Sequence, residues 1–153
     1  MKILQVLTKI KEWANSDRPI DILFIAVNEV SADFQIRVFN DQIGYRDIYG
    51  NAPKPTYSDP YKKVRANYNP PKQTNVVDFQ LSESLRRSIK TVREQTGVKL
   101  VLSTAQEAKI SAFIEQYRGT KIFELSEEEN KRVSEIAIEL MLKDIKAIFN
   151  EFL

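Results

Sequence analysis

The chain has 153 residues, 42% of them hydrophobic and 29% charged, and a formal net charge of +2, which is typical of one globular domain spanning residues 1–153. It contains no cysteine and no histidine, so disulfides, Cys/His zinc sites, thiol nucleophiles and Ser-His-Asp triads are excluded. Most common enzyme mechanisms are thereby ruled out, and only carboxylate, lysine or tyrosine chemistry stays open.

The sequence contains no segment typical of a membrane span or an export signal. The longest strongly apolar stretch runs from Ile20 to Val27 and contains Asp21, whereas a bilayer requires about 20 apolar residues. Lys9, Lys11 and Glu12 interrupt the region where a signal peptide would be apolar. We expect a protein that is made in the cytoplasm and has no membrane partner.

Two amphipathic helices are predicted near the N-terminus. Apolar residues at helical spacing mark the first helix: Ile3, Val6, Leu7, Ile10, Trp13 and Ala14. Asp17 and Pro19 mark the start of the second helix. Its apolar stripe consists of Ile20, Leu23, Phe24, Val27, Val30 and Phe34. We expect this second helix to be the central buried one, and the stretch "FQIRVF" (34–39) to finish as a short strand.

The middle of the chain, from about 40 to 75, shows neither helical nor strand periodicity. Five of the six tyrosines and five of the six prolines lie between Tyr45 and Pro71. A long irregular loop inside a compact domain is uncommon and is usually functional or disordered. The sequence leaves open whether this loop is a flexible insertion or a docking arm.

Regular structure is predicted again after this loop. Val76, Val77 and Phe79 indicate a short strand, and residues 82–88 indicate one or two turns of helix. The stretch "SIKTVREQTGVKLVLST" predicts a hairpin with Gly97 at its turn.

Two capped helices are predicted at the C-terminal end. Thr104 with Glu107 forms a capping-box pattern that opens a helix ending at Gly119, and Ser126 with Glu129 opens the long final helix. The expected fold is therefore α+β, with N- and C-terminal helices packed on a small antiparallel sheet and a long irregular loop at about 40–75.

The charges are unevenly distributed. The segment 53–99 has ten basic and four acidic residues, a net charge of +6, whereas the segment 120–153 has five basic and eight acidic residues, a net charge of −3. Such polarity is suited to head-to-tail contacts between copies or to a nucleic-acid partner.

Two acidic patterns were considered as catalytic or metal sites. The run 127–129 is explained by its position in the first turn of a helix, where carboxylates favour the positive end of the dipole. Asp59 together with Glu107 and Lys109 has the residue types of a metal-dependent nuclease, but Glu107 and Lys109 fall on a predicted helix rather than a strand. This interpretation ranks behind the two functions developed next.

The aromatic and basic residues of the loop and of the following turn are the best candidates for a binding surface. Tyrosine and arginine anchor protein interfaces, and the same residues stack on bases and neutralise phosphates. The interface candidates are Tyr57, Tyr61, Arg65, Arg86 and Arg87. A nucleic-acid-binding module that uses the basic segment 53–99 is the alternative function.

The order of the motifs from about Phe34 onward resembles that of the tailed-phage virion morphogenesis, or tail-completion, proteins. Their signature, Leu, two residues, Thr-Gly, one residue, Leu, two residues, Ser-Ile, is similar to "DFQLSESLRRSI". Leu85, Ser88 and Ile89 match it, Ser82 stands for the threonine, and Glu83 stands for the glycine. The stretches "YSDPYKKVR", "KISAFIEQYRG" and "IFELSEEE" also look like family segments.

The resemblance implies a structural virion protein of the head-tail neck or tail, without catalytic residues, cofactor, metal or small-molecule substrate. It implies neighbours among the connector, stopper, tail terminator or tube proteins, and copies of the chain itself in a symmetric ring. Non-specific contact with DNA in the channel is a further expectation. The loop at about 40–75 would then be an arm that becomes ordered when it docks.

Overall fold

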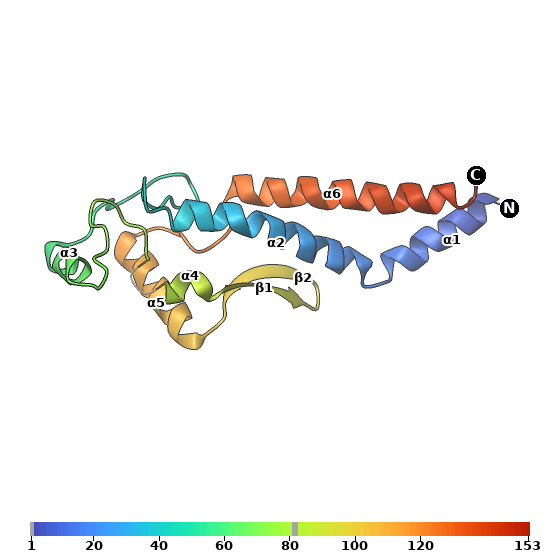
Figure 1. Cartoon of the computed structure of the whole chain (residues 1–153). Helices are drawn as coiled ribbons and strands as arrows, with labels where there is room; N and C mark the ends of the chain where they lie inside the picture. The colour runs from blue at the N-terminus through green and yellow to red at the C-terminus, as the bar shows by residue number, and fades with distance from the viewer. Residues whose placement is uncertain (1, 81–82) are drawn as a thin grey trace.

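Two long antiparallel helices, α2 (Arg18–Val38) and α6 (Glu127–Asn150), form the axis of an elongated molecule (Figure 1). The computed structural model describes residues 2–80 and 83–153. The two helices pack through a buried cluster made of Ile22, Ala26, Val27, Val30, Val133 and Ala137. The predicted central position of the second helix is confirmed.

Helix α1 (Lys2–Ala14) lies beside the C-terminal half of α6, so that both chain ends are found at the same end of the molecule (Figure 1). Val6 and Trp13 face the packed side of α1. Trp13 also donates a hydrogen bond from Nε1 to Asp144 Oδ2 on α6, at 2.9 Å. This end of the molecule therefore consists of helices alone.

The strand expected at 34–39 is wrong, because α2 continues to Val38. Phe34 and Val38 are both fully buried and stand four residues apart, which places them on one face of a helix. They reach a second buried cluster at the opposite end of the molecule, which contains Phe34, Val38, Phe39, Tyr45, Tyr57, Val77, Leu85 and Ile122.

The sheet is the predicted hairpin. Strands β1 (Ile89–Glu94) and β2 (Gly97–Leu102) pair antiparallel, with Glu94 opposite Gly97. Gly97 therefore opens the second strand instead of forming the turn, which consists of residues 95 and 96. The hairpin packs against α2, and this arrangement of terminal helices around a small antiparallel sheet confirms the α+β prediction.

The strand expected at 76–79 is also wrong. Val77 is fully buried, and its carbonyl accepts a hydrogen bond from the Tyr45 N–H at 2.7 Å. Phe79, however, has φ = 55°, a left-handed conformation that interrupts an extended strand. The side chain of Asp78 takes part in a buried network described below.

Both predicted helix starts carry an N-cap, and the predicted capping box is complete at Ser126 but only half formed at Thr104. Helix α5 (Ala105–Arg118) begins after Thr104, whose side chain accepts a hydrogen bond from the Glu107 N–H, and it ends at Gly119 with φ = 73°. Helix α6 begins with a complete capping box between Ser126 and Glu129. Local sequence patterns therefore located these helix ends correctly.

The signature segment folds as a left-handed residue, one helical turn and a strand. Glu83 has φ = 60°, helix α4 (Ser84–Arg87) follows it, and β1 comes next. The predicted turn of helix is confirmed from Ser84 onward, whereas Ser82 lies outside the described residues. Glu83 thus adopts the conformation that glycine adopts most readily.

We expect Glu83→Gly to raise the free energy of unfolding by about 1 kcal/mol. The left-handed conformation costs a residue with a Cβ about 1–2 kcal/mol, and the larger entropy of glycine in the unfolded chain offsets part of the gain. Urea denaturation measures the difference. Glu83→Ala is the control, because it removes the ion pair with Arg87 but keeps the Cβ; equal stability of the two variants would contradict the argument.

A second prediction concerns acid sensitivity at the α1–α6 end. The hydrogen-bonded Arg18 guanidinium, followed by the Trp13 N–H, lowers the pKa of Asp144 below its usual 3.8. Because the folded state binds this proton less readily than the unfolded state, the stabilisation is present at neutral pH and is lost as pH falls through the folded-state pKa.

We therefore expect Asp144→Asn to be destabilised at pH 7 and to lose part of the acid dependence of the unfolding midpoint. Trp13 is the only tryptophan, so its fluorescence reports directly on this end of the molecule. Asp41→Asn, at an exposed position, serves as the control. If the unfolding midpoints of Asp144→Asn and of the unmodified protein fell by the same amount as the pH is lowered, this explanation would be wrong.

Candidate functional site

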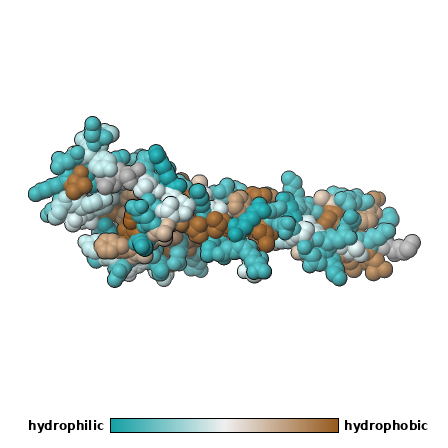
Figure 2. Space-filling model, turned by 90° about the horizontal axis from the view of Figure 1, so that it is seen from below, coloured by the Kyte–Doolittle hydropathy of each residue, from teal (hydrophilic) through white to brown (hydrophobic). Residues whose placement is uncertain are grey.

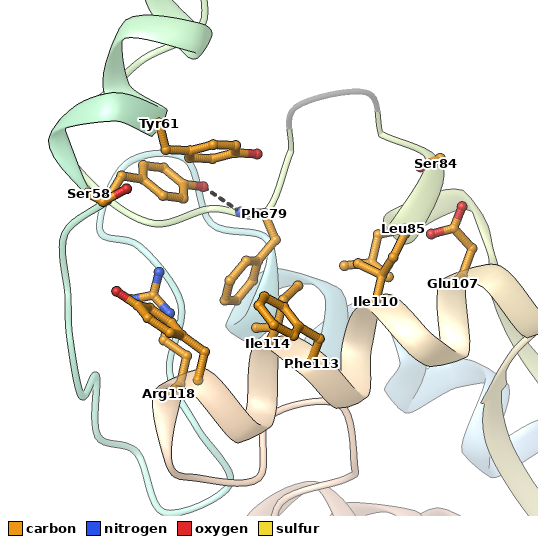
Figure 3. A pocket seen from close by; sticks show the side chains of 12 residues that line it. Ser58, Tyr61, Phe79, Ser84, Leu85, Glu107, Ile110, Phe113, Ile114 and Arg118 are labelled. Atoms are coloured by element: carbon orange, nitrogen blue, oxygen red, sulfur yellow. Dashed lines mark hydrogen bonds between the residues drawn. The ribbon is translucent and has the colours of Figure 1, made fainter.

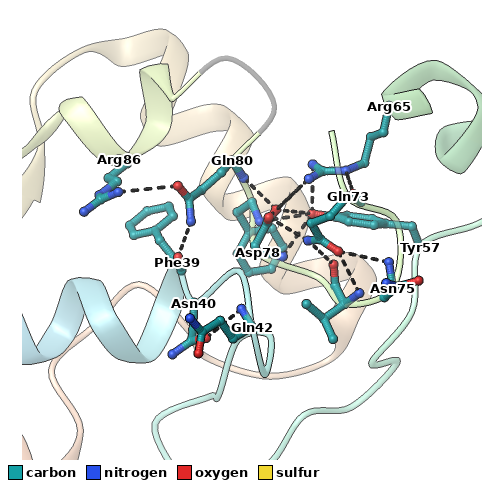
Figure 4. Close-up of polar contacts among 12 residues, drawn as sticks. Phe39, Asn40, Gln42, Tyr57, Arg65, Gln73, Asn75, Asp78, Gln80 and Arg86 are labelled. Carbon is teal, nitrogen blue, oxygen red and sulfur yellow. Dashed lines mark hydrogen bonds and ion pairs between the residues drawn. The ribbon is translucent and has the colours of Figure 1, made fainter. Parts of the chain in front are cut away.

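The segment 40–75 is held in place by a buried polar network. Arg65, on helix α3 (Asp59–Ala66), is fully buried and forms an ion pair with Asp78, with 2.9 Å between Nη2 and Oδ1. The Tyr57 hydroxyl donates to Asp78 Oδ1 at 3.0 Å and accepts from Arg65 Nη1 at 3.2 Å. Figure 4 shows these side chains converging from three segments of the chain.

The remaining donors and acceptors of the network are satisfied by nearby groups. The side-chain amide of Gln73 donates to Asp78 Oδ2 at 2.6 Å, and the backbone carbonyl of Gln73 accepts from Arg65 Nε at 2.7 Å. The backbone N–H groups of Asp78 and Phe79 donate to the Tyr57 hydroxyl. This degree of pairing is what a buried charge pair needs to offset its desolvation.

Burial, followed by the neighbouring Asp78 carboxylate, raises the pKa of the Tyr57 hydroxyl far above its usual value of 10.0. Tyr57 is therefore a neutral phenol at physiological pH and does not act as a base there. Its chemical role in this site is hydrogen bonding.

These contacts correct two expectations about the middle segment. Residues 59–66 form α3, so they are not irregular, and the segment is anchored to the core in the isolated chain. Tyr57 and Arg65 were expected at an interface, but both are buried and bind their own chain. The aromatic and basic composition of this segment is in part the composition of an internal anchor.

The other three interface candidates reach the surface. Tyr61 lies at the edge of a groove, and its ring centroid is 5.1 Å from that of Tyr57. Arg86 and Arg87 are exposed on α4. Arg87 forms an ion pair with Glu83 at 2.9 Å, and Arg86 donates to the side chains of Gln35 and Gln80 at 3.3 and 3.4 Å.

The groove lies between α3, α4 and α5 and has a volume of about 520 Å³. Its apolar lining includes Tyr61, Phe79, Leu85, Ile110, Phe113 and Tyr117. The ring of Phe113 is 69% exposed, although the sequence pattern placed it on the apolar face of its helix. Figure 3 shows Phe113 and Ile110 on the side of α5 that borders the groove.

Each end of the groove carries a charged side chain that is more than nine-tenths buried. Glu107 is 8% exposed, and its Oε2 atom has no hydrogen-bond partner within residues 2–80 and 83–153. Arg118, near the other end (Figure 3), donates from Nη1 to the Lys54 carbonyl and stacks near the rings of Tyr45 and Phe79. The groove thus combines an apolar lining with a buried carboxylate oxygen that lacks a partner among the described residues.

The sequence contained the apolar stripe of α5 but no signal for the groove or for the Arg65–Asp78 pair. Thirteen positions separate Arg65 from Asp78, and no periodic pattern links them. In the part of the chain that the structure describes, Asp59 and Glu107 do not belong to a group of three or more acidic side chains placed to hold a metal ion.

The basic segment 53–99 is partly neutralised by its own chain. Five of its ten basic side chains form ion pairs: Lys62, Arg65, Arg87, Arg93 and Lys99. One of the tyrosines expected to stack on bases, Tyr57, is buried. The site therefore combines an apolar groove with a basic segment whose charge is partly paired within the chain.

We expect Arg65→Ala to lower the free energy of unfolding by about 3–5 kcal/mol, because it leaves the buried Asp78 carboxylate without its partner. The segment 45–72 should also become accessible to protease. Arg87→Ala is a matched control, because it removes an exposed pair of the same 2.9 Å length, worth at most about 1 kcal/mol. Urea denaturation and limited proteolysis measure both effects; similar losses in the two variants would contradict the anchoring role.

Among the described residues, no helix is both long enough and apolar enough to cross a membrane. Comparison with known protein families, with curated proteins and with solved structures found no match.

Proposed function

We propose that this chain is a structural protein of a tailed-phage virion, located in the head-tail neck or tail-completion ring. It acts by docking onto other proteins without catalysis. Its partners are neighbouring connector, stopper, tail terminator or tube proteins and further copies of the chain. It is assembled in the host cytoplasm.

One observation carries the proposal. Glu83 stands at the glycine position of the signature and has φ = 60°, the backbone conformation for which a glycine is favoured. Leu85, three positions from Ser88, is buried in the core cluster, and Ile89 begins the hairpin. The signature residues are thus those that shape this turn, so their resemblance to the family has a structural reason.

The exposed groove supports a role in docking. Exposed apolar side chains on soluble monomers are usually scattered over the surface, and several of them gathered in one groove mark an interaction site. The polar network behind the groove keeps Tyr61 and Phe79 in position before a partner arrives, which lowers the entropic cost of binding. Non-specific contact with channel DNA would fall to exposed charges such as Arg86.

The proposal predicts that the chain is part of the finished particle. Quantitative mass spectrometry of purified particles should find it in a constant, low ratio to the portal protein across preparations. A non-structural phage protein measured in the same particles provides the background level. Absence of the chain from intact particles would contradict the proposal, and a DNA affinity that falls steeply with salt would then favour the nucleic-acid alternative.

A further inference from the structure

Among the described residues, the α5 groove leaves two buried polar atoms, Glu107 Oε2 and Arg118 Nε, without a partner, and much of its apolar lining is exposed. Glu107 is buried, yet its Oε2 atom is unpaired within the described residues, and a buried polar atom without a partner carries a free-energy penalty. Seven residues further along α5, Ile114 lines the same groove, with Ile110 and Phe113 between them. An occupant that satisfies this groove must bring a cation at one end and apolar side chains along about 10 Å of helix.

Helix α1 has these components on its exposed face. Leu4 is 69% exposed and Leu7 is 56% exposed, while Val6 is buried on the other side of the helix. Lys11 follows Leu7 by four residues and Leu4 by seven, so these three side chains lie on one face. The exposed face of α1 is therefore an apolar stripe that ends in a lysine.

If α1 runs antiparallel to α5, the charged and apolar side chains on its exposed face come in the same order, and at the same spacing, as the groove residues of α5. Lys11 then meets Glu107, Leu7 meets Ile110, and Leu4 meets Phe113 and Ile114. Both runs span seven residues, or about 10 Å at 1.5 Å per residue. A helix that inserts anchors at positions i, i+3 and i+7 into an apolar groove is a recurring mode of recognition.

Helix α1 and the groove lie at opposite ends of the elongated molecule (Figure 1), so the contact is between two copies. Figure 2 shows hydrophobic side chains reaching the surface both at the end that holds α1 and toward the opposite half of the molecule. We propose that α1 of one copy docks antiparallel to α5 in the groove of a second copy, with Lys11 on Glu107.

Such a contact is heterologous, because it joins two different surfaces. Each copy keeps one free α1 and one free groove after the first contact, so association continues until a ring closes or a filament grows. The contact does not depend on the virion role, and self-association of the purified chain tests it separately from particle composition.

The test is sedimentation velocity of the full chain and its variants over a range of concentrations. We expect Leu7→Asp and Phe113→Asp each to weaken self-association at least about tenfold. A mixture of the two variants should form a 1:1 complex, because one retains an intact groove and the other an intact α1. Ile36→Asp introduces the same charge at an equally exposed site on α2 and should leave association unchanged.

Two matched variants test the proposed ion pair between Lys11 and Glu107. Lys11→Glu should weaken association, whereas Lys9→Glu, two residues away on the opposite side of α1 and paired with Glu12, should not. Leu7, Phe113, Lys9 and Lys11 are exposed, so the variants retain the fold, which circular dichroism verifies. The proposal would be overturned if the unmodified chain were monomeric at all concentrations. It would also be overturned if Leu7→Asp weakened association and Phe113→Asp did not, or if the mixture of these two variants formed no complex.

Discussion

The end of the molecule that holds the groove depends on the buried ion pair between Arg65 and Asp78. It joins α3 to the segment just before α4, and Tyr57 and Gln73 complete its hydrogen bonds. A charged pair is stable in this position because the groups around it satisfy its donors and acceptors. Without it, α3 would lose its buried link to residues 73–78, and the groove would lose one wall.

A second polar junction connects this end to the helical axis. Arg37, in the last turn of α2, donates to both carboxylate oxygens of Glu129, at 2.8 and 3.1 Å, and to the carbonyls of Arg46, Ile122 and Glu124. Glu129 also closes the capping box of α6. One carboxylate therefore fixes the start of α6 and its alignment with α2, so the groove and the helical end are parts of one connected framework.

The two ends of the molecule differ in how completely they bury their apolar residues. The two apolar clusters that contain residues of α2 are buried, whereas the outer faces of α1 and α5 are exposed to solvent. An elongated shape cannot cover every helix face with its own chain, because its surface is large for its volume. Contacts with other molecules, which we propose above, would cover these exposed faces.

Patterns between neighbouring residues determined much of the fold. Apolar spacing and capping residues located α1, α5 and α6 and the hairpin, because these elements follow from interactions within a few positions of the chain. Tertiary structure decided the rest. It extended α2 to Val38, placed a left-handed residue at Phe79 in the expected strand 76–79, and buried Arg65 beside Asp78. It also left the apolar face of α5 uncovered, since burial depends on which distant segments fold against a helix and not on its own periodicity.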